Sequence, residues 1–337
     1  MLTDDIFMRV AIDRAWEYQL ITYPNPAVGA LVELNGRVLA VEAHREAGTS
    51  HAEVLALLRA YEELSNRKIE FNRLDANLAH NFLLSLPRGF FSNCSIYVTL
   101  EPCSHTGKTP SCATLLSKLK PKRVVVGTLD PIGSHSGGVE LLKSVGVEVE
   151  VGVLEREAEE LIEPFIIWQK RAFVIFKIAQ TSNGRIGGGY LSSKESLTHL
   201  HKIRSKLSWL IIGGNTVRVD RPTLDCRFIG ANPPDIAILS KKSLDEFDKT
   251  IPLFNIEDRR VEILSSDIFK KPSLILVEGG EGTIGALKDK FDWLLQYQTP
   301  KISSHPLGYG INLELEPLHQ MRSGVDLALW SRFKRYR

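Results

Sequence analysis

Three residues that could bind a transition metal occur early in the chain. His51-Ala52-Glu53 comes first, Glu101-Pro102-Cys103 follows, and Cys112 completes the set. Zinc prefers tetrahedral nitrogen and sulfur ligands, and a site with three protein ligands keeps a fourth position open for water. One imidazole and two thiolates therefore predict a catalytic zinc site formed by His51, Cys103 and Cys112.

Glu53 lies two residues after the first ligand, and we expect it to move protons rather than to bind the metal. Zinc can lower the pKa of a bound water to about 7. A neighbouring carboxylate can then take the water proton and pass protons to a ring nitrogen and to departing ammonia. The arrangement resembles the His-x-Glu and Pro-Cys signature of zinc nucleobase deaminases. A set of structural or unrelated thiols is the alternative, which the ordered spacing disfavours.

The elements that would position these residues alternate between helix and strand. Apolar periodicity predicts helices over about His51 to Leu64 and Ser111 to Leu119, which places a ligand at each helix N-terminus, where thiolate and hydroxide are favoured. Thr109 and Pro110 are predicted as the N-cap and first residue of the second helix. The other predicted elements of this half are a helix over Asp5 to Tyr18 and strands over Ala27 to Leu34, Arg37 to Ala43, Ser95 to Leu100, Arg123 to Gly127 and Val147 to Val151.

Length and composition limit the classes of function. A chain of 337 residues exceeds the usual size of one hydrophobic core, which favours two domains. The formal net charge of +2 gives no large positive field, which weakens any function that depends on binding nucleic acid through its phosphates. No apolar run is long enough to span a membrane, and the N-terminus lacks a signal-peptide pattern, so we expect a cytoplasmic protein without a membrane partner. Four cysteines in a reducing compartment favour metal ligation over disulfides.

A second α/β pattern begins after an acidic helix predicted over Glu155 to Ile162. We expect domains at residues 1–152 and 153–337. The segment 66–92 fits no template and is predicted to be a surface insertion without an assigned function. The strands predicted in the second half are Ala172 to Ala179, Trp209 to Ile212, Ile236 to Leu239 and Leu274 to Val277.

The first half resembles the bifunctional deaminase/reductase family of riboflavin biosynthesis. The family motifs stand here as Pro24-Asn25-Pro26-Ala27-Val28-Gly29, His51-Ala52-Glu53 and the loop from Pro102 to Cys112. The resemblance extends over nearly the whole chain in the family's order. It implies a substrate with a pyrimidinone ring and a ribose phosphate. The residues at matching pocket positions, each of which could otherwise be an ordinary turn residue, are Asn25, His44, His105 and Lys108.

The second half has no Gly-x-Gly-x-x-Gly fingerprint after a predicted strand. Its glycine pairs at strand ends could let a backbone approach phosphates, and they match family motifs as Gly213 to Val217, Asp220 to Arg227 and Glu278 to Gly280. The resemblance implies that the cofactor NADPH contacts Ala179, Thr216, Asp220 and Gly280. It implies that the phosphoribosyl substrate contacts Lys177, Arg204, Leu224, Arg227 and Glu278, where arginine forks suit a phosphate.

The resemblance also implies the fold and the reaction. We expect an α/β protein with an N-terminal cytidine-deaminase-like three-layer α/β/α domain and a C-terminal dihydrofolate-reductase-like α/β domain. The first domain would use zinc to deaminate a diamino(phosphoribosylamino)pyrimidinone. The second would use NADPH to reduce the ribosyl chain to a ribityl chain. Whether the chain forms a homo-oligomer stays open.

Two alternatives stay open, the first because the chain departs from the family pattern at three places. Asn183 replaces the usual Asp of a turn, the loop Gly187 to Ser192 is shortened, and Asp130 to Gly137 lacks a second Asn-Pro. The second domain could therefore be a degenerate, non-catalytic module beside an active deaminase. A nucleic-acid base deaminase would share the zinc chemistry but would need a basic channel and stacking aromatics.

Overall fold

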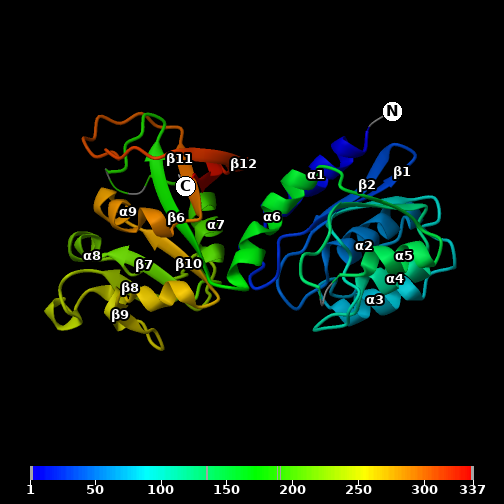
Figure 1. Cartoon of the computed structure of the whole chain (residues 1–337), viewed down its shortest axis with the longest axis horizontal. Coiled ribbons are helices and arrows are strands. Elements are labelled where there is room, and N and C mark those ends of the chain that lie inside the picture. The colour runs from blue at the N-terminus through cyan, green and yellow to red at the C-terminus, as the bar shows by residue number, and fades with distance from the viewer. Residues whose placement is uncertain (1–2, 134–135, 188, 190, 335–337) are drawn as a thin grey trace. The chain divides into compact units, whose positions relative to one another are not determined.

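The computed structural model of the chain describes residues 3–133, 136–187, 189 and 191–334. It forms two compact units, Met1–Ile166 and Ile167–Arg337, each of which is described by itself (Figure 1). Two of the family departures lie partly outside the described residues, because Ser134, His135, Gly188 and Tyr190 are not among them.

The first unit is built on a five-stranded sheet with the order β2-β1-β3-β4-β5. Strand β1 runs antiparallel to β2 and β3, whereas β3, β4 and β5 are parallel. Every strand predicted for this half is present. The bounds are β1 (Gly29–Leu34), β2 (Arg37–Ala43), β3 (Ser95–Leu100), β4 (Arg123–Thr128) and β5 (Glu148–Val151).

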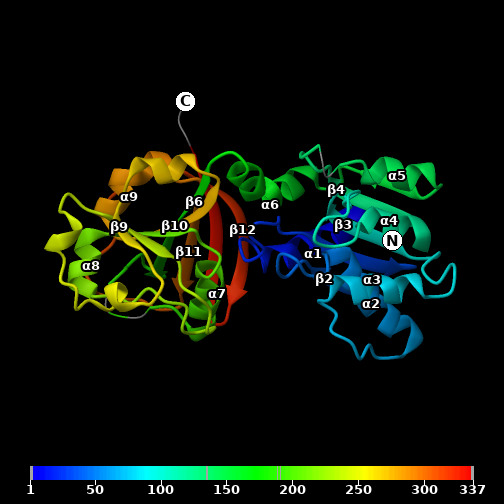
Figure 2. The same cartoon turned by 90° about the horizontal axis from the view of Figure 1, so that it is seen from below.

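Helices cover both faces of this sheet, which confirms the predicted three-layer arrangement (Figure 2). On one face, alternate residues of β3 and β4 share a buried apolar core with the helices α2 to α5. On the other face, Tyr97 of β3 packs against Phe7 of α1, and Gly127 approaches Ala158 of α6 so closely that a Cβ would lie 2.8 Å from that side chain. The helices are α1 (Asp4–Trp16), α2 (Ala52–Ser65), α3 (Ala76–Leu84), α4 (Cys112–Leu119), α5 (Gly138–Ser144) and α6 (Glu155–Trp168).

Segment 66–92 contains the helix α3, which the sequence did not predict. Asp75 caps it by accepting hydrogen bonds from the backbone N–H groups of Asn77 and Leu78, as N-cap residues do. Ala79 and Leu83 are buried in the core with α2 and α4. The segment is therefore not only a surface insertion. Nine residues are too few to display a clear helical period in sequence.

Helix α6 packs with the first unit. Arg9 of α1 forms an ion pair with Glu157 at 2.8 Å, and Gln19 Nε2 donates to the carbonyl of Leu161 at 2.9 Å. The compact units divide after Ile166, later than the boundary expected from sequence. The division at 152/153 stays a prediction about where each function begins.

The second unit contains an eight-stranded sheet with the order β12-β13-β11-β6-β10-β7-β8-β9. All neighbours from β11 to β9 are parallel, and the hairpin β12-β13 adds antiparallel strands at one edge. The strands are β6 (Ala172–Thr181), β7 (Trp209–Gly213), β8 (Asp235–Leu239), β9 (Val261–Ile263), β10 (Ser273–Glu278), β11 (Trp293–Thr299), β12 (Leu315–Ser323) and β13 (Asp326–Phe333).

The helices of this unit lie on both sides of its sheet. Helix α7 (Lys194–Arg204) places His199 against the rings of Tyr297 and Trp330 on one face. On the other face, Ile284 and Leu287 of α9 (Glu281–Leu287) join a core with alternate residues of β6 and β10. Helix α8 (Gly214–Asp220) follows β7 directly. No helix in the described part of the chain is long and apolar enough to cross a membrane.

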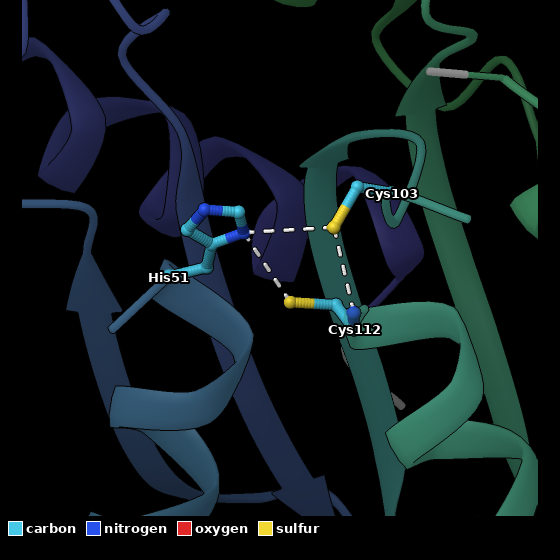
Figure 3. Close-up of side chains that lie close together, drawn as sticks. All are labelled: His51, Cys103 and Cys112. Carbon is cyan, nitrogen blue, oxygen red and sulfur yellow. Dashed lines mark hydrogen bonds between the residues drawn. The ribbon is translucent and has the colours of Figure 1, made fainter. Parts of the chain in front are cut away.

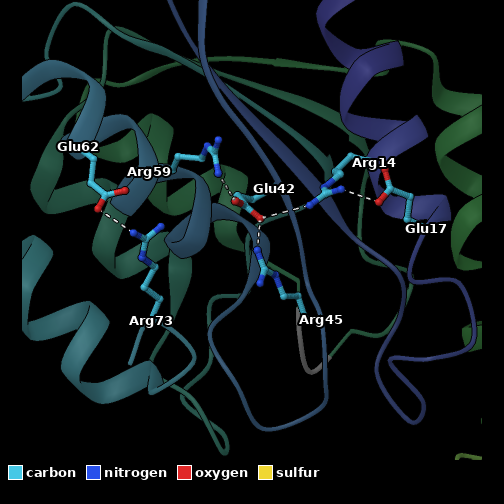
Figure 4. A network of polar contacts seen from close by, with 7 residues as sticks. All are labelled: Arg14, Glu17, Glu42, Arg45, Arg59, Glu62 and Arg73. Atoms are coloured by element: carbon cyan, nitrogen blue, oxygen red, sulfur yellow. Dashed lines mark hydrogen bonds and ion pairs between the residues drawn. The ribbon is translucent and has the colours of Figure 1, made fainter. Parts of the chain in front are cut away.

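Glu42 near the end of the edge strand β2 binds three arginines (Figure 4). Its carboxylate, which is buried, lies 2.8 Å from Arg45, 3.7 Å from Arg59 and 3.9 Å from Arg14. Arg14 belongs to α1 and Arg59 to α2, which cover opposite faces of the sheet. Charges along an edge strand also oppose pairing with another chain. The network therefore joins both helical layers at the exposed edge of the sheet.

We predict that Glu42→Gln destabilises the first unit by about 2 kcal/mol. Loss of one partner from a buried pair costs about 3–5 kcal/mol, and the partial exposure of the arginines reduces this value. The matched control is Glu63→Gln, which removes the exposed pair with Arg37 and should change stability by less than about 0.5 kcal/mol. Urea denaturation followed by circular dichroism measures both. Equal small changes would contradict the role given to Glu42.

Candidate zinc centre and second-unit site

The three predicted ligands converge at the N-termini of α2 and α4 (Figure 3). His51 Nδ1 lies 3.7 Å from Cys103 Sγ and 3.4 Å from Cys112 Sγ. The three ligand atoms all lie within 4.8 Å of one another. A tetrahedron with zinc–ligand bonds of 2.0–2.3 Å has edges of about 3.5–3.8 Å. The donor set and its spacing therefore fit a zinc ion with a fourth position left for water.

The two thiols share a negative charge. A hydrogen bond with Cys112 and the neighbouring His51 lower the pKa of Cys103 to about 3, against the effect of burial. The same contact with Cys103, together with burial, raises the pKa of Cys112. Two adjacent sulfurs ionise together only beside a cation. A bound zinc ion would supply that positive charge.

Thr109 and Ser111 hold the ligands in place, in roles that differ from the sequence prediction. Helix α4 begins at Cys112, and its N-cap is Ser111, whose hydroxyl accepts from the backbone of Thr114 at 3.1 Å. The N-cap prediction for Thr109 was therefore wrong. Instead, Thr109 Oγ1 lies 3.1 Å from His51 Nε2, where it can accept the imidazole proton and leave Nδ1 for the metal. A spacing rule could not reveal this contact, because it joins two different loops.

Glu53 lies in the first turn of α2 and is 4% exposed. Burial raises the pKa of its carboxyl above the ordinary value, and the charge of Cys103 acts in the same direction, whereas His51 opposes the shift. Its side chain also contacts Cys112. A raised pKa suits a carboxyl group that both accepts and donates protons near neutral pH.

Glu101 of the Glu-Pro-Cys motif holds the segment that follows β4. Its buried carboxylate accepts hydrogen bonds from the backbone N–H groups of Gly137, Val139 and Asp130, at 3.0, 3.0 and 3.2 Å. These bonds fix the segment after β4 against the residue that precedes Pro102 and Cys103. Its role is therefore structural, which the motif alone did not indicate.

A pocket of about 310 Å³ opens onto the ligands His51 and Cys103 and onto Glu53. The pocket contains all four residues expected to bind the pyrimidine substrate: Asn25, His44, His105 and Lys108. His44 is buried, and burial together with the neighbouring His51 lowers its pKa to about 4. The neutral ring lies 3.3 Å from the carbonyl of Ser50 through Nδ1 and 3.1 Å from Asn25 Nδ2 through Nε2.

These contacts fix how Asn25 is turned. A carbonyl only accepts, so His44 Nδ1 carries the ring proton, and the bare Nε2 accepts from the Asn25 amide. The side-chain oxygen Oδ1 of Asn25 and the second N–H of its amide are left for a ligand. His105 and Lys108 are exposed at the rim of the same pocket.

In the second unit, Lys177, Arg204 and Glu278 form a charged cluster. Lys177 and Glu278 are register partners on β6 and β10, and Arg204 of α7 pairs with Glu278 at 2.9 Å. Burial lowers the pKa of Lys177, whereas the charges of Lys177 and Arg204 lower the pKa of Glu278 despite its burial. Arg204 is 6% exposed, and its Nε has no hydrogen-bond partner among the described residues. One buried donor is therefore left for a ligand.

Leu224 and Arg227 lie on the loop that Arg204 contacts through the carbonyl of Asp225 at 2.9 Å. Leu224 is buried, whereas Arg227 is exposed and pairs with Asp225 at 2.7 Å. Arg259 donates to the carbonyls of Thr223, Leu224 and Pro234 and so holds this loop. No sequence motif points to Arg259, because only the folded loop brings it near residue 224.

The positions expected to contact NADPH lie on β6 or on the segments that follow β7 and β10. Ala179 lies on β6, Thr216 and Asp220 on α8, and Gly280 after β10. A Cβ at Gly280 would meet no atom within 4 Å, whereas one at Gly213 would lie 2.6 Å from Thr283 Oγ1. The space beside Gly280 is therefore open, and ligands bind at the carboxyl ends of such strands. The glycine-rich edge fits a dinucleotide.

The Asn183 departure has a structural explanation. Asn183 Nδ2 donates to the carbonyl of Ser303 at 2.8 Å, and its Oδ1 accepts from the Ser303 backbone at 3.1 Å. An aspartate could not donate the first bond. Gly187, at the start of the shortened loop, lies where a Cβ would be 2.1 Å from the His305 ring. Both residues thus fit the segment that follows β11.

Comparison with known proteins identifies the family. Residues 1–128 match the cytidine and deoxycytidylate deaminase zinc-binding region. The whole sequence is 32% identical to the riboflavin biosynthesis protein RibD of Aquifex aeolicus, with 99% of each chain aligned. This chain belongs to the RibD family. A RibD of Synechocystis is also 32% identical, over 73% of this chain and 61% of its own length.

Solved structures of the RibD family have the same overall fold. The diaminohydroxyphosphoribosylaminopyrimidine deaminase/5-amino-6-(5-phosphoribosylamino)uracil reductase of Thermotoga maritima is 28% identical, with a TM-score of 0.64 and 98% of each chain covered. A RibD of Acinetobacter baumannii, at 21% identity, has a TM-score of 0.63 over 98% of this chain. The predicted fold class, a deaminase-like domain followed by a reductase domain, is confirmed.

We predict that Thr109→Val lowers zinc affinity about tenfold, because it removes the partner of His51 Nε2 and leaves the ring free to turn. Competition with a chromophoric chelator measures the affinity. Thr106→Val, at an exposed position of the same loop, is the matched control and should bind zinc like the unaltered chain. Equal affinities in the two variants would show that Thr109 does not orient the ligand.

Proposed function

We propose that this chain catalyses two successive steps of riboflavin biosynthesis. The first is hydrolytic deamination of a diamino(phosphoribosylamino)pyrimidinone, and the second is NADPH reduction of the ribosyl chain to give an amino(phosphoribitylamino)uracil. The observation that carries the proposal is the cluster of His51, Cys103 and Cys112 beside a pocket lined by His51, Cys103 and Glu53, in a chain related to RibD over its full length.

In the first step, zinc held by His51, Cys103 and Cys112 would activate a water molecule for attack on the ring carbon that bears the amine. Glu53 accepts the water proton and delivers protons to the ring nitrogen and to the leaving ammonia. Asn25, oriented by His44, presents one N–H and its side-chain oxygen to the pyrimidine edge. Lys108 at the rim meets the phosphate.

In the second step, NADPH supplies the hydride. The residues that bind the cofactor are Ala179, Thr216, Asp220 and Gly280. Arg204, through its unpaired Nε, and Arg227 hold the phosphoribosyl end of the substrate. Lys177 and Glu278 orient the sugar beside the nicotinamide, while Leu224 excludes water from the contact.

The nucleic-acid deaminase alternative has less support. Lys108 is the one lysine or arginine among the described residues that line the pocket, and Phe165 is the one Phe, Tyr or Trp. A channel for a polynucleotide needs more of both. If the purified protein deaminated single-stranded DNA or tRNA and left the pyrimidine phosphate unchanged, this alternative would replace our proposal.

We further propose that the reactions take place in the cytoplasm on small-molecule substrates, without a nucleic-acid or membrane partner. Residues 1–152 and 153–337 are our working limits for the deaminase and reductase functions. Homo-oligomer formation stays an untested prediction, which light scattering of the purified chain measures directly.

We predict that Glu53→Gln lowers the deaminase turnover number at least about 1000-fold, because an amide cannot shuttle the proton. Ammonia release measures this step. Zinc content should stay near that of the unaltered chain, since Glu53 is not a ligand. NADPH oxidation with the deaminated intermediate should also be unchanged. Retention of deaminase activity in this variant would overturn the role of Glu53.

We predict that Arg204→Lys raises KM for the deaminated intermediate at least about tenfold, because a lysine lacks the planar fork of donors. Steady-state NADPH oxidation measures the effect. Lys202→Ala, at an exposed position of the same helix, is the control. If the unaltered chain oxidises no NADPH with this intermediate, the second domain is a degenerate module and only the deaminase half of the proposal survives.

A further inference from the structure

The segment that connects β11 to β12, residues 300–314, forms no helix or strand, but it is held in place by hydrogen bonds. On one side it runs beside the loop that follows β6 (Figure 1). The Ser182 backbone N–H donates to the carbonyl of Lys301 at 2.8 Å, and the Ile186 N–H donates to the carbonyl of Leu307 at 3.1 Å. These bonds anchor the first half of the segment.

The second half of the segment reaches the turn between β10 and α9. Tyr309 Oη donates to the carbonyl of Gly279 at 3.1 Å, and the Gly310 backbone N–H donates to Glu281 Oε2 at 3.4 Å. The Tyr309 ring packs edge-on to Phe176 of β6, with 6.3 Å between the ring centroids. Burial raises the pKa of the Tyr309 hydroxyl, so the group keeps its proton and stays a donor. One anchored side chain therefore joins the segment to this turn.

The peptide unit that accepts from Tyr309 also carries a donor at the expected cofactor site. The carbonyl of Gly279 and the N–H of Gly280 belong to one planar trans peptide, in which the two groups point in opposite directions. Because Tyr309 fixes the direction of the carbonyl, it also fixes the N–H, which points away from the tyrosine. A Cβ at Gly280 would meet no atom within 4 Å. There is therefore room for a ligand beside Gly280.

Thr283 of α9 holds the same turn by a different contact. A Cβ at Gly279 would lie 2.4 Å from Thr283 Oγ1, and the Thr283 backbone N–H donates to the carbonyl of Gly280 at 3.0 Å. Thr283 is buried. Two successive glycines have more backbone freedom than any other pair of residues. The contacts with Thr283 and Tyr309 remove that freedom before a ligand arrives.

We propose that Tyr309 is a positioning residue of the cofactor site, which holds the Gly279–Gly280 peptide so that its N–H is directed at NADPH. A backbone that is ordered before binding loses less conformational freedom on binding, and this raises affinity. The inference rests on the second step of the proposed function, because the contact of Gly280 with NADPH belongs to that step. It adds a role for segment 300–314, which no sequence motif indicated.

The test deletes one hydroxyl group at a time. Tyr309→Phe keeps the ring against Phe176 and removes only the donor to Gly279. Ser304→Ala, at an exposed position of the same segment, is the matched control because it also removes one hydroxyl. We expect Tyr309→Phe to raise the dissociation constant for NADPH about three- to tenfold, the contribution of one hydrogen bond, and Ser304→Ala to leave it unchanged. Fluorescence titration with NADPH measures this constant without turnover.

A second measurement needs no cofactor. Hydrogen–deuterium exchange followed by mass spectrometry reports the protection of the backbone amides at residues 279–287. In the chain without NADPH, these amides should exchange faster in Tyr309→Phe than in the unaltered chain, and Ser304→Ala should not change them. Ammonia release in the deaminase step should be the same in all three proteins, because Tyr309 belongs to the second unit.

The outcomes are distinct. If Tyr309→Phe binds NADPH as tightly as the unaltered chain, or leaves amide exchange unchanged, the inference fails while the proposed function stands. If the two variants weaken binding equally, the effect is not specific to the Gly279 contact and the inference also fails. If the unaltered chain itself binds no NADPH, the reductase step fails and the inference fails with it. Binding of NADPH without reduction of the deaminated intermediate would contradict the proposed reaction but leave the comparison of dissociation constants intact.

Discussion

The first unit depends on a single constraint: two sulfurs and one imidazole nitrogen must stay within bonding distance of a common centre. The sulfurs repel each other when both are ionised, and burial makes that repulsion stronger. Helices α2 and α4 ease the conflict because both begin at this point. His51 is the N-cap of α2 and Cys112 the first residue of α4, so the positive ends of two helix dipoles face the thiolates.

That constraint explains the arrangement of the neighbouring polar groups. Thr109 fixes the imidazole, Ser111 joins the start of α4 to the carbonyl of Cys103, and Glu101 binds three backbone N–H groups of the next loop. None of these groups is a ligand, but each removes freedom from an element that carries one. This rigidity requires polar atoms to be buried near the metal. The buried polar side chains of Thr109, Ser111 and Glu101 all have hydrogen-bond partners.

Local patterns in the sequence predicted the chemistry better than the geometry around it. Short motifs determine the type and order of the metal ligands and of the proton-transfer residue. The sequence was therefore sufficient to predict His51, Glu53, Cys103 and Cys112. The strands of the first unit followed from apolar runs. The contact between Thr109 and His51 could not be predicted from the sequence, because it depends on how two loops meet. The same holds for Arg259, which reaches the carbonyl of Thr223 only in the folded chain.

Helix α3 shows the other limit of sequence reasoning. Its four buried residues, Ala76, Ala79, His80 and Leu83, have helical spacing, but the exposed leucines Leu78 and Leu84 and the polar His80 hide that period in the sequence. Asp75 was a visible N-cap candidate, but an N-cap without a periodic segment after it predicts little. The helix exists because α2 and α4 leave an apolar surface that Ala79 and Leu83 cover. Tertiary packing therefore decides the structure of this segment.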